Sequence, residues 1–119
     1  MSAGTYNTTI DKGSTFSLTV TYKDASGDPV NLTGWTARMQ IRETPSSAST
    51  ILTSTGVSPT ITITNTNFAT GVILVTISAT NTASISVPVA YYDIEVESGA
   101  GLVRRVLQGR LSISPEVTR

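Results

Sequence analysis

The sequence predicts an all-β protein, an Ig-like antiparallel β-sandwich of about seven or eight strands with one short helical turn. Segments that alternate apolar and polar residues recur roughly every ten residues, with turn-forming Gly, Asn and Asp between them. No long segment has a helical period. The chain has no cysteine, so it lacks the Cys–Trp–Cys signature of immunoglobulin domains, and "Ig-like" refers to architecture alone. Its 119 residues are expected to form one β-sandwich domain, residues 1–119.

The composition excludes several functional classes. Eight basic and eight acidic residues balance, whereas nucleic-acid-binding proteins usually carry a basic excess. The absence of Cys and His excludes disulfides, thiolate metal sites and the commonest general base. Ser and Thr occupy 36 of the 119 positions, so hydroxyl groups are expected to solvate the outer faces. We therefore expect a protein that is not an enzyme and has no cofactor, no metal and no nucleic-acid partner.

No segment of the sequence is suited to a membrane. The longest apolar runs, such as Val72–Val75, are far shorter than the roughly 20 residues that span a bilayer. The N-terminus has neither the charged region nor the apolar region of a signal peptide. We expect neither a membrane partner nor secretion by the general route.

Three strands are expected in the first part of the chain. Thr5–Ile10 is β-prone but polar, which is typical of a short edge strand. Thr15–Tyr22 and Trp35–Glu43 alternate cleanly, with their apolar residues on one face. Trp35 is the only tryptophan, and as the first inward residue of its strand it is interpreted as a core residue rather than a ligand-stacking platform.

The later segments continue the pattern. The strands expected there are Ile51–Leu52, Thr60–Thr64, Val72–Ile77 and Pro88–Glu97. Between the last two, Ser78–Ile85 does not alternate and begins with a serine that can act as an N-cap. We expect it to form a helical turn or two that crosses from one sheet edge to the other.

The last strand, Leu102–Ser114, organises the others, because at about thirteen residues it can reach across a small sheet. Gly109 interrupts it, which indicates either a bulge or the close approach of another backbone. The candidate core consists of inward residues of this strand and of the earlier ones. These are Phe16, Leu18, Val20, Trp35, Met39, Ile41, Ile73, Val75, Tyr92, Ile94, Leu107 and Leu111.

A two-residue loop at Gly99–Ala100 would fix the register of the final hairpin. It would place Glu95 opposite Arg104, a favourable charge pair. It would also place Arg105 among inward apolar residues, which is a conflict. Arg105 is then expected at the sheet rim with its head in water, or beside a buried polar partner.

Charged residues on strand faces are the candidate binding groups. Arg38 and Arg42 share an outward face and could bind an anionic partner, but pairing with Glu43 or nearby Asp residues is the preferred interpretation. Glu95 and Glu97 also share one face and could bind calcium or act as an acid pair. A solvent shell or an arginine partner is the simpler interpretation of the two glutamates. No catalytic constellation is present in the sequence.

Several segments, taken in order, resemble a domain that is widespread in tailed-phage genomes. The segments are Gly13–Leu18 (GSTFSL), Asn31–Thr36 (NLTGWT) followed by Ala37–Arg42 (ARMQIR), Thr70–Gly71, Ile77–Thr82 (ISATNT), Tyr92–Glu95 (YDIE) and Arg105–Gly109 (RVLQG) leading to Ser114–Arg119 (SPEVTR). Their order looks like that of small phage tail or baseplate proteins and is similar to the N-terminal domain of phage upper baseplate proteins. The match spans nearly the whole chain.

The resemblance implies a structural component of a tailed bacteriophage virion, made in the host bacterial cytoplasm. A tail, baseplate or fibre-attachment adaptor subunit is expected, with other virion proteins as partners in a multi-copy or oligomeric assembly. No fibre or receptor-binding module follows Ser114–Arg119, so a direct receptor role is not expected. The alternatives are a capsid decoration protein and a carbohydrate-binding module, for which Tyr6, Tyr91 and Phe68 are the candidate stacking residues.

Attachment to neighbours is expected through edge strands and termini, because edge strands carry unpaired backbone groups. The candidate partner-binding residues are Thr5, Tyr6, Pro115, Glu116 and Arg119. The opposing interpretation is that both ends are frayed.

Overall fold

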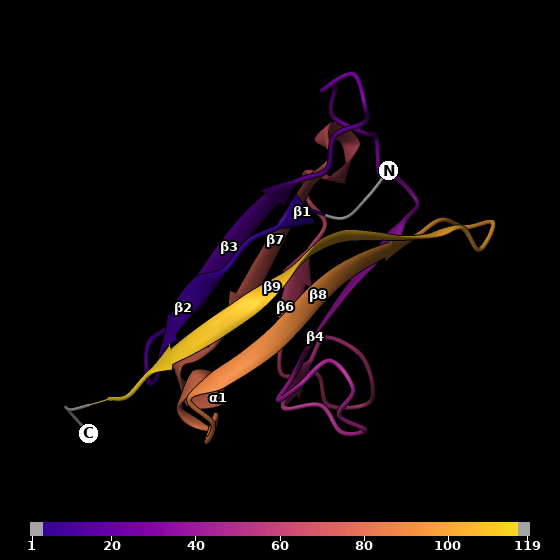
Figure 1. The fold of residues 1–119 in the computed structure, drawn as a ribbon. Helices are drawn as coiled ribbons and strands as arrows, with labels where there is room; N and C mark the ends of the chain where they lie inside the picture. The colour runs from indigo at the N-terminus through magenta and orange to yellow at the C-terminus, as the bar shows by residue number, and fades with distance from the viewer. Residues whose placement is uncertain (1–3, 117–119) are drawn as a thin grey trace.

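The computed structural model describes residues 4–116 and shows an all-β sandwich of two sheets (Figure 1). The larger sheet holds β1 (Gly4–Thr5), β2 (Thr8–Asp11), β4 (Thr36–Arg42), β5 (Leu52–Thr53), β8 (Val89–Glu97) and β9 (Val103–Ser114). The smaller sheet holds β3 (Phe16–Thr21), β6 (Thr62–Thr64) and β7 (Val72–Ile77). The remaining elements are a short 3-10 turn, η1 (Phe68–Thr70), and helix α1 (Ala79–Ala83). The predicted fold class is confirmed.

Strand β9 pairs with three other strands of the larger sheet. The larger sheet runs β1-β9-β8-β4-β5, and β2 also pairs with β9. Strand β9 pairs antiparallel with β8 on one side and parallel with β1 and β2 on the other. The smaller sheet runs β3-β7-β6 and is antiparallel throughout.

The core lies between the two sheets, where the inward faces of the alternating strands meet. The expected core residues that are buried are Val20, Met39, Ile41, Ile73, Val75, Tyr92, Ile94 and Leu111. Those that are half-buried and packed against the core are Phe16, Leu18, Trp35 and Leu107. Trp35 is therefore at the margin of the core and not its centre, because it precedes β4 in a turn held by its N–H bond to the Leu32 carbonyl at 2.9 Å.

Helix α1 connects β7 of the smaller sheet to β8 of the larger one. The Ser78 hydroxyl accepts the Asn81 N–H at 3.2 Å, which is the predicted N-cap. The helix crosses between the sheets as expected. It does not run from edge to edge, however, because β7 and β8 are both interior strands.

The predicted register of the final hairpin is wrong by two separate steps. The loop has three residues, not two: Ser98 N–H bonds to the Leu102 carbonyl at 2.9 Å, and Gly101 adopts the left-handed conformation that closes such loops (φ 90°). A β-bulge between Ile94 and Glu95 then adds a second shift. The longer loop places Glu95 opposite Arg105, where Arg104 was expected, and the bulge moves the pairs from Ile94 onward by one more residue.

The same bulge removes the conflict over Arg105. Arg105 is exposed on the outer face of the sheet, while the next residue, Val106, is buried in the core. Asp93 lies opposite Gln108. The extra residue lets a charged side chain and an apolar one each reach a suitable environment.

Of the two alternatives expected for Gly109, the structure shows the close approach of another backbone. The bulge lies at Ile94 and Glu95 instead. A Cβ on Gly109 would overlap the Tyr6 carbonyl group. Around this crossing Tyr6 N–H bonds to the Gln108 carbonyl and Arg110 N–H bonds to the Asn7 side-chain oxygen, both at 2.9 Å. The Tyr92 hydroxyl donates to the Tyr6 carbonyl at 2.6 Å. We call this set of bonds the Tyr6 crossing.

Replacing Tyr92 by Phe tests the Tyr6 crossing. Y92F leaves the Tyr6 carbonyl without its donor and should lower the free energy of unfolding by about 1–2 kcal/mol in urea titrations. Burial, with a smaller effect of Tyr6, raises the pKa of Tyr92 from 10.0 to about 12. Because the raised pKa belongs to the folded state, this residue's contribution is complete below pH 10 and is lost as the pH rises through about 12.

The difference in the free energy of unfolding between wild type and Y92F should therefore decrease as the pH rises from 10 to about 12. The control is Y91F, since the neighbouring Tyr91 is half-buried on the opposite face of β8. Equal losses in Y91F and Y92F would contradict a specific role for the Tyr92 hydroxyl.

Candidate functional site

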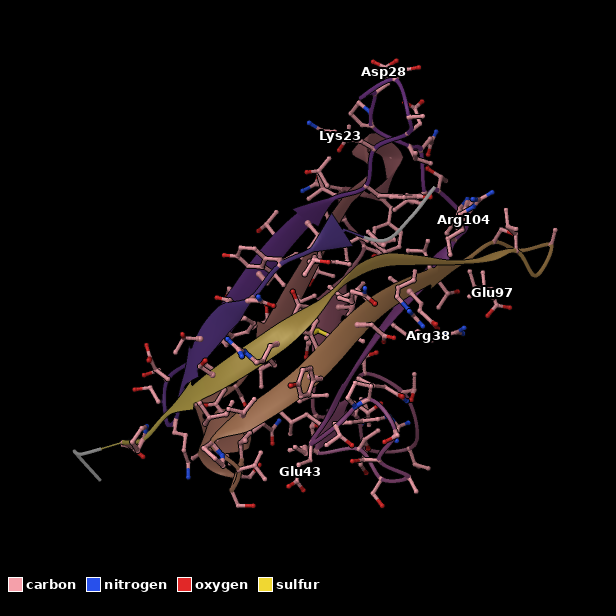
Figure 2. All side chains as sticks on the ribbon, viewed as in Figure 1. Lys23, Asp28, Arg38, Glu43, Glu97 and Arg104 are labelled. Carbon is pink, nitrogen blue, oxygen red and sulfur yellow. The ribbon has the colours of Figure 1, made fainter. Side chains whose placement is uncertain are left out.

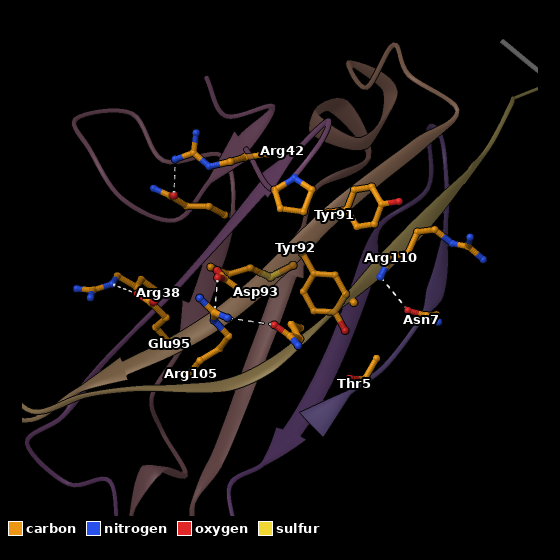
Figure 3. A pocket seen from close by; sticks show the side chains of 15 residues that line it. Thr5, Asn7, Arg38, Arg42, Tyr91, Tyr92, Asp93, Glu95, Arg105 and Arg110 are labelled. Carbon is orange, nitrogen blue, oxygen red and sulfur yellow. Dashed lines mark hydrogen bonds and ion pairs between the residues drawn. The ribbon is translucent and has the colours of Figure 1, made fainter. Parts of the chain in front are cut away.

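A depression lies on the outer face of the larger sheet, over β4, β8 and β9 (Figure 3). We call this depression, of about 700 Å³, the outer groove. Alternate residues of a strand point to the same face, so three neighbouring strands each contribute a row of side chains. The rows are Arg38, Gln40 and Arg42 from β4, Tyr91, Asp93 and Glu95 from β8, and Arg105, Gln108 and Arg110 from β9.

Arg38 is held by two carboxylates of the neighbouring strand. Its Nε lies 2.9 Å from Glu95 Oε1 and its Nη1 lies 2.8 Å from Glu97 Oε1. Hydrogen bonds to Glu95 and Glu97 raise the pKa of Arg38 above its ordinary value. The pairing expected for Arg38 thus occurs, but with β8 and not with Glu43, which Figure 2 shows far from Arg38. The two glutamates engage an arginine, as the simpler interpretation proposed.

Asp93 is a carboxyl of the outer groove with a shifted pKa. Its Oδ2 lies 3.3 Å from Arg105 Nε. Burial, followed by repulsion from Glu95, raises the pKa of Asp93, and attraction from Arg105, Arg42 and Arg38 opposes the shift only partly. The ionised carboxylate is therefore less favourable in the folded protein than in water.

Arg42 contacts neutral groups instead of carboxylates. Arg42 donates to the Ser47 carbonyl and the Gln40 side-chain oxygen, each at 2.9 Å, and thereby anchors the loop after β4. Arg110 is exposed at the other side of the groove, beyond Tyr91 (Figure 3). Four arginines against Asp93 and Glu95 leave the groove with a formal excess of two positive charges. It is suited to polar contacts with a partner that carries carboxylate groups.

The expected partner-binding residues lie at two separate places along the β9 edge. Thr5 and Tyr6 are exposed beside Gln108, and Thr5 also lines the outer groove. Pro115 is exposed just beyond the far end of β9, and Glu116 is half-buried close to Gly13. Arg119 lies outside the described residues. The structure does not bring these residues together into one surface.

The aromatic residues considered for glycan stacking also lie apart. Phe68 is buried in the core, Tyr91 lines the outer groove, and Tyr6 lies in a second depression beside β3. A glycan platform needs aromatic faces on one surface, and these three residues do not form one. No observation favours the carbohydrate-binding alternative.

The sequence did not predict three residues of the groove, Tyr91, Gln108 and Arg110. Their positions on the outward faces of β8 and β9 could have indicated them. The pairs that they form across the two strands, however, depend on the bulge. Within residues 4–116 there is no group of three or more His, Cys, Asp or Glu side chains placed to hold a metal ion. In the same residues no helix has the length and apolarity needed to cross a bilayer.

Comparison with known proteins gives no relatives: no family model matches the chain, and no curated protein does. The description of the outer groove therefore rests on its own residues.

Replacing Asp93 by Asn tests the electrostatics of the groove. A carboxyl with a raised folded-state pKa contributes stability when protonated, and that contribution is lost as the pH rises above 3.8 through the raised value. At about pH 7, D93N should therefore be at least as stable as wild type, despite the loss of the Arg105 ion pair.

The measurement is the urea midpoint of D93N and wild type between about pH 3 and pH 7. The difference should vanish at the acid end, where Asp93 of the wild type is protonated. D28N, a change in an exposed turn, is the matched control. A clear loss of stability of D93N at neutral pH would show that the ion pair outweighs the cost of burial.

Proposed function

We propose that this protein is a structural, non-enzymatic component of a tailed bacteriophage virion, serving as a tail, baseplate or fibre-attachment adaptor. Its expected partners are other virion proteins. The observation that carries the proposal is that the segments which resemble the phage domain contact one another. They bind each other as parts of one fold, so the resemblance concerns the architecture of the whole domain.

Thr82 joins the ISATNT segment to the GSTFSL segment. It is fully buried, with a relative exposure of 0%. Its hydroxyl accepts the Gly13 N–H at 3.1 Å and lies 2.8 Å from the Ser14 carbonyl, to which it can donate. The helical turn is thereby fixed to the chain that enters β3, about seventy residues earlier in the sequence.

The YDIE segment is joined in the same way to two others. Glu95 pairs with Arg38 of the ARMQIR segment, and Asp93 pairs with Arg105 of the RVLQG segment. Tyr92 lies opposite Gly109 at the end of RVLQG and bonds to the strand that passes over it. These pairs join the segments into one fold, because each segment is completed by residues of another.

The outer groove adds a surface suited to such a role. Its ion pairs are set on adjacent strands of a continuous sheet, so the charged groups are held in position before a partner arrives. Pre-organised polar groups give a docking surface specificity at a low entropic cost. A subunit that occupies a fixed place in an assembly needs this kind of rigid face.

Mass spectrometry of purified phage particles tests the proposal. The protein should be found in the particles in several copies. Separating tails from heads before the measurement distinguishes the adaptor from a capsid decoration protein, which could use the same fold. Complete absence from particles that carry all the other structural proteins would contradict both placements.

Deletion of residues 115–119 tests whether the C-terminal segment attaches the subunit. The truncated protein should fold, because Pro115 and Glu116 follow the last strand, but its copy number in particles should fall. Circular dichroism and quantitative mass spectrometry measure the two effects. Incorporation at the wild-type copy number would show that this segment is not an attachment element.

A further inference from the structure

Strand β3 forms an open edge of the smaller sheet. It pairs with β7 over all six of its residues, and no described strand pairs with its other side. The strand, FSLTVT, contains no charge, proline, glycine or bulge. These are the features with which proteins usually protect an exposed edge from other strands. The edge strands β5 and β6 differ from β3 because they are very short, with two and three residues.

The direction of the backbone groups of β3 follows from one hydrogen bond. Tyr22 N–H bonds to the Gly71 carbonyl at 2.8 Å, directly after β3 and in the same register. Because hydrogen-bonded positions alternate in antiparallel pairs, Phe16, Leu18 and Val20 direct their backbone groups to β7. Ser17, Thr19 and Thr21 therefore direct theirs to the open side. No hydrogen bond within residues 4–116 occupies these groups.

A depression of about 410 Å³ lies beside this edge. Leu18 and Val20 of β3 line one side, and Tyr6 and Leu107 of the larger sheet line the other. In a constant-type immunoglobulin sandwich the first strand belongs to the sheet that contains the equivalent of β3. Here β1 and β2 pair with β9, so the position next to β3 is vacant.

We propose that the vacant position is filled by β3 of a second copy of this chain. The two strands would run antiparallel about a two-fold axis that passes through Thr19. The outward-directed groups of Ser17, Thr19 and Thr21 would then bond to those of Thr21, Thr19 and Ser17 of the second copy. The result is a continuous six-stranded sheet across the dimer, built on an isologous interface.

The side chains of β3 suit self-pairing. In this register the half-buried Leu18 lies opposite Val20 and the half-buried Phe16 lies opposite Tyr22, so apolar residues of the two copies meet on the inner face. On the outer face Thr19 meets Thr19, a pair that can exchange a hydrogen bond. A charged strand would place like charges opposite one another about the two-fold axis. The neutral sequence of β3 avoids this repulsion.

A single introduced cysteine tests both the contact and its register, because the natural chain has no cysteine. T19C places two thiols opposite one another, with Cα atoms about 5.5 Å apart, within the range that a disulfide spans. T21C is the matched control, because its two thiols would be roughly 13 Å apart along the strand. Under mild oxidation T19C should form a reducible covalent dimer and T21C should remain largely monomeric. The double variant S17C/T21C should crosslink again, since these positions face each other.

Wild-type protein and T19P, compared by sedimentation equilibrium, test the dimer without crosslinking. Proline at position 19 removes an N–H directed to the open side and none directed to β7, so T19P should fold but remain monomeric. Wild type should be dimeric at micromolar concentration. Monomeric wild type, or equal crosslinking of T19C and T21C, would overturn the proposal and leave strand addition to a different protein. The inference does not rest on the proposed virion role, and each can fail alone.

Discussion

The close approach of the Tyr6 backbone to Gly109 is the constraint on which the N-terminal edge depends. Any side chain at position 109 would occupy the space of the Tyr6 carbonyl, so only glycine lets the first strand pass over β9. Tyr92 compensates for the missing side chain, because its ring lies against Gly109. Its hydroxyl donates a hydrogen bond to the Tyr6 carbonyl. Asn7 supplies the remaining acceptor from its side chain. With the crossing in place, Ile10 is held in the core with no exposed surface.

The β-bulge in the last hairpin has an equally general effect. Without it, Arg105 would point between the sheets, and an unpaired guanidinium buried there would cost far more than one irregular position in a ladder. With it, Arg105 turns outward to Asp93, and the charges of three strands become neighbours. The outer groove thus depends on the register of β9 against β8. A shift of one residue would move the apolar side chains of β9 out of the core and its polar side chains out of the groove. Hydrogen bonds to Glu95 and Glu97 raise the pKa of Arg38, whereas burial is the main cause of the raised pKa of Asp93.

The sequence predicts those features that depend on local patterns. Strand β3 was expected within one residue at each end, because its alternation is a property of the segment itself, and Ser78 was expected as a cap because its side chain acts on the next few residues. Positions that depend on distant partners were predicted poorly. Whether Gly101 belongs to the hairpin loop is decided by its left-handed conformation, which the letters GAG leave open. The bulge has no local signature, so the neighbours of Asp93 in the groove, and hence the groove itself, could not be derived from the sequence.

The pairing of the first strand with the last has a consequence for how the chain is made. Gly4 pairs with Leu107, so this contact spans nearly the whole sequence. During synthesis the segment that holds β1 leaves the ribosome about one hundred residues before its partner strand. Strand β1 must therefore wait unpaired until β9 has been made, and closure of so long a loop favours slow folding. A chain cut short before residue 103 lacks β9 altogether and leaves β8, an interior strand of the complete sheet, as an unpaired edge. Chains that lack β9 are thus exposed to aggregation and proteolysis.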